Sequence, residues 1–95
     1  MAVQVEWDFR KASSNLRKHA VSFDEASTVF DDKLAIMFDD LEHSQDEPRE
    51  IIVGHSIRGR LLIVSFTERQ PDILRIISAR SANRKEIKEY EENNY

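Results

Sequence analysis

Residues 60–80 read RLLIVSFTERQPDILRIISAR, and this stretch predicts the centre of the fold. Two runs rich in apolar and β-branched residues, 61–66 and 73–77, flank the polar segment 70–72, which holds a proline and an aspartate. Apolar runs of this length separated by a few turn residues predict a β-hairpin. The second run also contains Arg75, and an arginine in an apolar strand is costly unless it meets an anion or faces a polar cleft. We therefore expect the hairpin to be buried on one side only.

The segments around the hairpin predict further strands and helices. Alternation of apolar and polar residues predicts strands, and helical spacing after capping residues predicts helices. The expected strands are 3–7, 34–38 and 50–55, and the expected helices are 9–19 after Asp8, 23–30 after Ser22, and one after Asn83. The resulting order is β-α-α-β-β-β-β-α, which predicts a single α+β domain over residues 1–95. Its antiparallel sheet would be packed against helices on one face, leaving the other face for a ligand.

The spacing of apolar residues in the expected helix 9–19 predicts which of its faces is buried. Phe9, Ala12, Leu16 and Ala20 fall within one narrow stripe at 100° per residue, so we expect this stripe to face the core. His19 and Asn15 lie one turn apart on a border of the stripe, and Lys18 lies opposite it in solvent.

Composition limits the possible function classes. The 95 residues are 40% hydrophobic and 34% charged, which is typical of a soluble globular protein. The absence of cysteine excludes disulfides and thiolate metal sites. No apolar run is long enough to span a bilayer and the first residues lack a signal-peptide pattern, so we expect a cytoplasmic protein without a membrane partner.

The charges are separated along the chain. Residues 31–50 carry eight acids against two bases, whereas residues 53–85 carry seven bases against two acids, within an overall net charge of −4. Either the two segments form salt bridges with each other, or the basic segment presents a face to an anionic partner such as nucleic acid.

Four ordered motifs resemble one known family. WDFRKASSNLRKHAVSFDEASTVFDD at 7–32, FDDLEHSQDEPREIIVGHS at 38–56, GRLLIVSFTER at 59–69 and RIISARSANRKEIKEYE at 75–91 together resemble the BrnT toxins. These are the ribonucleases of a bacterial type II toxin–antitoxin system. Two residues depart from the family pattern: Ala20 stands where glycine is expected and Asn83 where threonine is expected. Neither change removes a candidate catalytic group.

The resemblance implies a RelE-like fold and an endoribonuclease that arrests translation without a metal or other cofactor. It also implies a partner, a BrnA-like antitoxin with a ribbon-helix-helix domain, through which alone the toxin would contact DNA. Metal-free RNA cleavage uses the ribose 2′-OH as nucleophile, so it needs a base, an acid and cations that hold the charged phosphorane. The candidate catalytic residues are Arg75, Arg80, His19 and Glu68, and the candidate RNA-binding residues are Lys18, Arg69, Arg58 and Arg60.

Simple alternation along the second hairpin strand puts Arg75 and Arg80 on opposite faces. A bulge near Ser78, or a strand that ends before Arg80, would bring both to one face. Each candidate also has a structural interpretation: Arg75 as an internal salt bridge, His19 as a helix cap, and Glu68 as part of a solvated turn.

Two other functions remain open on the sequence. Asp39, Asp40 and His43, with Asp46 and Glu47 nearby, have the ligand types of a Mg²⁺ or Mn²⁺ nuclease, although all of them lie in one loop. Alternatively, the basic face belongs to a module that binds nucleic acid or a protein without catalysis.

Overall fold

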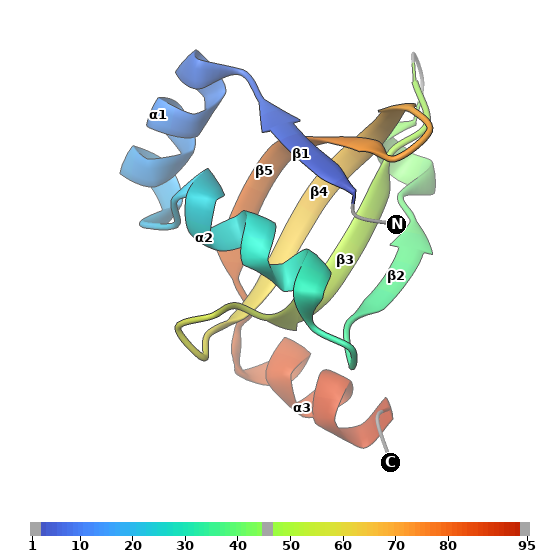
Figure 1. The fold of residues 1–95 in the computed structure, drawn as a ribbon. Coiled ribbons are helices and arrows are strands. Elements are labelled where there is room, and N and C mark those ends of the chain that lie inside the picture. Colours follow the sequence, from blue (N-terminus) through green and yellow to red (C-terminus); the bar gives the residue numbers. More distant parts are fainter. Residues whose placement is uncertain (1–2, 45–46, 94–95) are drawn as a thin grey trace.

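A computed structural model describes residues 3–44 and 47–93 and shows a mixed α+β architecture, as predicted (Figure 1). In chain order, the elements are β1 Gln4–Trp7, α1 Phe9–His19, α2 Phe23–Ser27, the 3₁₀ turn η1 Thr28–Asp31, β2 Ile36–Asp39, the 3₁₀ turn η2 Leu41–His43, β3 Glu50–His55, β4 Leu61–Gln70, β5 Ile73–Ser81 and α3 Arg84–Asn93. Within these residues, no helix has the length and apolar character needed to cross a membrane.

The strands form one sheet in the order β1-β5-β4-β3-β2. Strands β2 to β5 are an antiparallel meander, which confirms the prediction from their short connections. Strand β1 pairs in parallel with β5 at the edge of the sheet, and its last partnered residue, Trp7, lies opposite Ile76. The second half of β5 therefore has no strand on that side.

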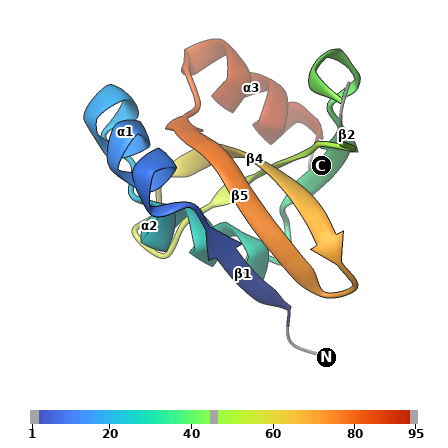
Figure 2. The same ribbon diagram turned by 90° about the horizontal axis from the view of Figure 1, so that it is seen from above.

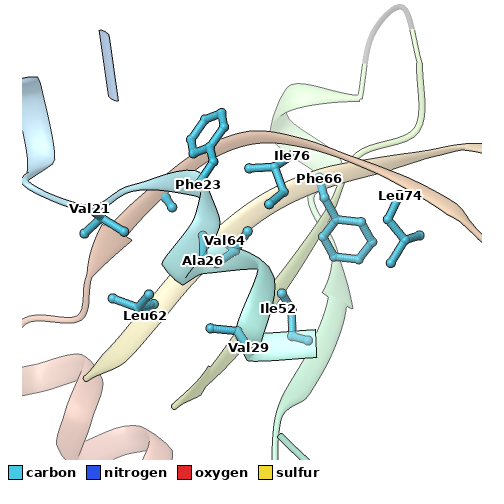
Figure 3. Packing of buried hydrophobic residues seen from close by; sticks show 11 residues of the cluster. Val21, Phe23, Ala26, Val29, Ile52, Leu62, Val64, Phe66, Leu74 and Ile76 are labelled. Carbon is cyan, nitrogen blue, oxygen red and sulfur yellow. The ribbon is translucent and has the colours of Figure 1, made fainter. Parts of the chain in front are cut away.

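The core lies between α2, η1 and one face of the sheet. Phe23, Ala26 and Val29 pack there against the inward side chains of the central strands (Figure 3). Phe23 and Phe66 are 1% exposed, and each such side chain contributes about 1.5–3 kcal/mol by leaving water. The hairpin at 60–80 is thus the floor of the core, as its apolar runs predicted.

The predicted burial of the α1 stripe is wrong for Phe9 and Leu16, whereas Ala12 is half-buried and packs against the core as predicted. Phe9 is 86% exposed and Leu16 is 52% exposed, whereas Asn15 is buried. The reason is that α2 already covers the face of the sheet. Helix α1 instead lies beyond the end of β1, against the free edge of β5, and turns Asn15 toward that edge (Figure 1). Periodicity finds the apolar side of a helix but not the surface against which it packs.

The helix ends follow the predicted capping residues. The Asp8 carboxylate accepts from the N–H groups of Arg10 and Lys11, and the Ser22 hydroxyl accepts from the N–H of Glu25. Asn83 and Glu86 form a complete reciprocal pair, with N···O distances of 2.8 and 3.0 Å.

The hairpin is longer than predicted and is irregular at one place that matters for function. Its strands run to Gln70 and Ser81. Ser65 pairs with Ser78, but the next residue of β4 pairs with Ile76, so Ile77 is an extra residue in β5. This bulge reverses the alternation and turns both Arg75 and Arg80 away from the helical face. Of the two alternatives left open by the sequence, a bulge near Ser78 and a strand that ends before Arg80, the structure shows the bulge.

Helix α3 does not share the face covered by α2, so that part of the prediction is wrong. It lies across the sheet from α2 (Figure 2), and Tyr90 faces Ile36, Val53 and Ile63 on the opposite surface. The Tyr90 hydroxyl donates to the carbonyl of Leu34 at 2.9 Å. The second surface of the sheet is apolar at this end, and α3 covers it there. The remainder of that surface stays open.

Candidate active site

A cleft of about 350 Å³ lies on the open face of the sheet, where β3, β4 and β5 meet the end of α1 and the loop after β2. Its walls carry two arginines, two histidines, two serines and one aspartate over an apolar floor. The lining residues are His19, Asp40, His43, Arg49, Ile51, Ile63, Ser65, Ile77, Ser78, Ala79 and Arg80.

Arg80 lines this cleft because the bulge turns it to the open face. Its two terminal nitrogens donate to the two carboxylate oxygens of Glu86, each at 2.8 Å. The hydrogen bond from Arg80 lowers the pKa of the Glu86 carboxyl to about 2, and the carboxylate raises the pKa of the guanidinium. The fork of Arg80 thus holds a planar pair of oxygen atoms, which is also how arginine binds phosphate.

His19 is the last residue of α1 and reaches the cleft from the edge of the sheet. A shallower groove of about 250 Å³ continues from it along α1 and contains Lys11 and Lys18. His19 and Ser78 line both hollows. Lys18, predicted as an exposed RNA-binding residue, is exposed and lies in the groove beside the candidate site.

Asp40 and His43 form a pair in the wall of the cleft. Their residue types had suggested metal ligands and not a cleft-lining pair. Nδ1 of His43 lies 3.1 and 3.0 Å from the two carboxylate oxygens of Asp40. The spacing Asp-x-x-His on a helical turn is a sequence signal for such a pair. What the sequence does not show is that the loop folds back over β3 and β4 toward Arg80.

A second hollow of about 340 Å³ adjoins the cleft and is mainly apolar. The two hollows share Ile51, Ile63 and Arg80. The floor of the second hollow comes from β2, β3 and β4, with α3 along one side. Both hollows thus have an apolar floor and charged side chains along their walls, and Arg80 lies at their junction.

Three other candidates lie away from the cleft. Arg75 shares the face of Arg80, but its Nη1 atom lies 3.4 Å from the Glu6 carboxylate on β1. Glu68 accepts from the Asp72 N–H at 3.3 Å in the hairpin turn, and Arg69 is exposed beside it. The structure brings neither Glu68 nor Arg69 to the cleft.

Arg60 and Arg58 lie at the turn before β4, on the side of α2. Nε of Arg60 donates to the buried Glu25 carboxylate at 2.9 Å, and its Nη2 donates to the Ala20 carbonyl at 3.2 Å. Arg58 lies 4.0 Å from the same carboxylate, to which Ser56 also donates. The hydrogen bond from Arg60 lowers the pKa of Glu25 and raises that of Arg60 itself. Arg60 therefore has a structural role in tying the turn to α2.

The charge separation is not explained by mutual salt bridges between the acidic and basic segments. Across residues 3–44 and 47–93, every arginine ion pair from the basic segment goes to an acid outside residues 31–50. These pairs are Arg58 and Arg60 with Glu25, Arg75 with Glu6, and Arg80 with Glu86. In the same residues, no three His, Cys, Asp or Glu side chains gather as a metal site, and Asp46 lies outside the described part.

Comparison with known proteins gives the class that fits this fold and cleft: a ribonuclease toxin of a type II toxin–antitoxin system. That description belongs to a family model that matches residues 7–86. The chain belongs to the BrnT family. Its structure is also similar to the crystal structure of the Brucella abortus ribonuclease toxin BrnT, with a TM-score of 0.67 and 24% identity over 87% of this chain and 100% of that one. Comparison with curated proteins gave no match.

Proposed function

We propose that this protein is a metal-independent endoribonuclease that cuts free RNA by attack of the 2′-OH on the adjacent phosphate, and so arrests translation. The observation that carries the proposal is that Arg80 and His19 line the same cleft. A guanidinium stays charged at all physiological pH values and can stabilise the phosphorane, while a histidine exchanges protons near neutral pH.

Glu86 marks the place of the substrate phosphate. Its carboxylate occupies two donor atoms of Arg80 in a planar arrangement that two phosphate oxygens can reproduce. A phosphate in the cleft competes for those donors, and the released Glu86 stays bound to the N–H of Asn83 at the start of α3. The ion pair thus holds Arg80 in position until RNA binds.

The surroundings of Arg80 fit a single RNA strand. Lys11 and Lys18 place positive charge along α1 beside His19, which suits the backbone of the strand. The floor of the second hollow, beyond Ile51 and Ile63, offers an apolar surface for a base next to the cut phosphate. We assign Arg75, further along the same face, to a phosphate outside the cleft.

The partner is a ribbon-helix-helix antitoxin that covers this face. Any contact of the complex with DNA is made by the antitoxin. The substrate and the partner are both cytoplasmic, which gives the toxin the same location. Association with the antitoxin would bury the open cleft and thereby exclude RNA from Arg80.

The test is cleavage of purified RNA without ribosomes and with excess EDTA. We expect wild-type protein to cut RNA but not a copy with 2′-deoxy sugars. Arg80→Ala should lower the rate by about 10²–10³. Arg84→Ala is the matched control, because Arg84 is exposed at the start of α3 and does not line the cleft. Arg75→Ala should raise KM and leave kcat near wild type.

Three results would contradict the proposal. Loss of cleavage in EDTA would identify a metal enzyme. RNA binding without shortened products would identify a binding module. Cleavage only on ribosomes would identify a ribosome-dependent nuclease.

A further inference from the structure

The loop that carries His43 is fixed by hydrogen bonds to its own ends. The Asp40 N–H donates to the Arg49 carbonyl at 2.8 Å. The Ser44 hydroxyl donates to the Asp40 carbonyl at 2.6 Å and accepts from the Arg49 N–H at 2.9 Å. These bonds close the loop across its base, so the turn with His43 keeps its position above β3. A side chain on such a frame is suited to chemistry that needs fixed geometry.

Within this loop, Asp40 orients the ring of His43. The carboxylate side chain is 13% exposed and takes Nδ1 between its two oxygens, while the imidazole is 62% exposed. Nδ1 therefore carries a proton in the hydrogen-bonded arrangement, and Nε2 is the atom available to a ligand in the cleft. A carboxylate behind an imidazole fixes its tautomer and balances the charge of the doubly protonated ring.

We propose that His43, oriented by Asp40, is the general acid of RNA cleavage and that His19 is the general base; this rests on the ribonuclease function proposed above. His19 accepts the proton of the 2′-OH, and the 2′-oxygen forms a bond to phosphorus. The bond from phosphorus to the 5′-oxygen breaks, and Nε2 of His43 gives its proton to that oxygen. The products are a 2′,3′-cyclic phosphate and a 5′-hydroxyl end, and no further reactant is consumed.

The different surroundings of the two histidines support this assignment of roles. The acid must begin protonated, and His43 has a carboxylate that compensates the added charge. The base takes up a proton, and among the described residues His19, at the end of α1 next to Lys18 and near Lys11, has no carboxylate behind its ring. Among residues 3–44 and 47–93, no carboxylate lies within ion-pair distance of His19. Arg80 and Arg49 lie in the same cleft as the two imidazoles.

The alternative is that the Asp40–His43 pair only stabilises the loop. An exposed pair of this kind contributes at most about 1 kcal/mol to stability. The loop frame also uses the backbone of Asp40, to whose carbonyl the His43 N–H donates at 3.4 Å, and no side-chain atom of His43. His43→Gln should therefore fold normally, which allows its effect on cleavage to be measured in an intact protein.

The experiment compares two versions of one short RNA that the wild-type protein cuts, with oxygen or sulfur at the 5′ bridging position of the cut linkage. Sulfur leaves without protonation, so it removes the need for an acid. We expect His43→Gln to lower kcat about 10²–10⁴-fold on the oxygen substrate and to cut the sulfur substrate within a few-fold of wild type. His19→Gln should be slow on both substrates. Asp40→Asn should resemble His43→Gln in a milder form.

The controls separate the possible failures. His55→Gln replaces a histidine that does not line the cleft and should keep wild-type rates on both substrates. Failure to find any RNA that the wild-type protein cuts would refute the ribonuclease proposal itself. If the wild-type protein is active, two results would refute the role of His43 as acid: full activity of His43→Gln, or equally slow cleavage of both substrates by His43→Gln. Either result would leave the ribonuclease proposal standing.

Discussion

Asn15 joins α1 to the free edge of β5, and replacing it should destabilise the whole domain. Its side-chain N–H₂ donates to the carbonyls of Val21 and Ala79 at 3.0 and 2.8 Å, and its oxygen accepts from the Ala79 N–H at 3.0 Å. The amide thus takes the place of a strand beyond the end of β1. All three backbone partners belong to residues that are at most 1% exposed.

The expected cost of Asn15→Ala follows from these bonds. Each hydrogen bond contributes about 1 kcal/mol, and the three backbone groups left without partners are buried. Alanine returns about 0.6 kcal/mol through its better helix propensity. The net loss should be about 2–3 kcal/mol, which lowers Tm by about 10–20 °C in a domain of this size.

Urea unfolding can measure this change in free energy, with Trp7 fluorescence and circular dichroism as probes. Trp7 is the single tryptophan and packs edge-on against Phe23 in the core, so its emission reports tertiary unfolding. Ser13→Ala, at an exposed position of the same helix, should change stability by less than about 0.5 kcal/mol. Asn15→Asp should lose at least as much as Asn15→Ala at neutral pH, because a carboxylate oxygen would then face two carbonyl oxygens. A loss below about 1 kcal/mol in both Asn15 variants would refute the reasoning.

Two further predictions concern stability. Ala20 ends α1 with φ 56°, a left-handed conformation that costs an alanine about 1–2 kcal/mol. Ala20→Gly should therefore raise the free energy of unfolding measured in urea by about 0.5–1 kcal/mol, because the greater chain entropy of unfolded glycine offsets part of the gain. An unchanged or lower urea midpoint would contradict this prediction. Glu86 has a pKa of about 2 in the folded protein, below its usual value of 4.5, so its contribution is complete above about pH 4.5 and is lost as the pH falls toward about 2. Because Arg80 is 44% exposed, we expect only about 1 kcal/mol from the pair, and Glu86→Gln should make the acid limb of a stability–pH curve shallower by that amount. An identical acid limb would contradict it, although Glu25, whose pKa is also lowered, keeps some slope in both proteins.

Local signals predicted the elements of the fold well because they depend on neighbours in the chain. The caps Asp8 and Ser22 mark the starts of α1 and α2, and the strand expected at Glu50–His55 has the bounds observed. The surface on which a helix packs depends on what else occupies the sheet. For that reason the stripe with Phe9 was wrongly expected in the core, and α3 was wrongly expected on the face of α2.

The candidate site was predictable only in part. Arg80 and His19 were selected by their chemistry, and both line one cleft. The pairing of Asp40 with His43 across from Arg80 depends on a loop that folds back over the sheet. Arg60 was assigned to RNA, yet the buried Glu25 carboxylate binds it. A sequence does not show which arginines are already paired with carboxylates far along the chain.

The sequence by itself determined the α+β class, the hairpin at 60–80 and the wealth of arginine around it, because apolar period and turn residues act locally. Only the tertiary structure decided how that hairpin is used. One extra residue, Ile77, reverses the alternation of β5 and turns Arg75 and Arg80 to the same face. The edge left free by the short β1 then receives α1, and that contact brings His19 to the cleft of Arg80. Both features depend on strand register, which is set by pairing between distant parts of the chain.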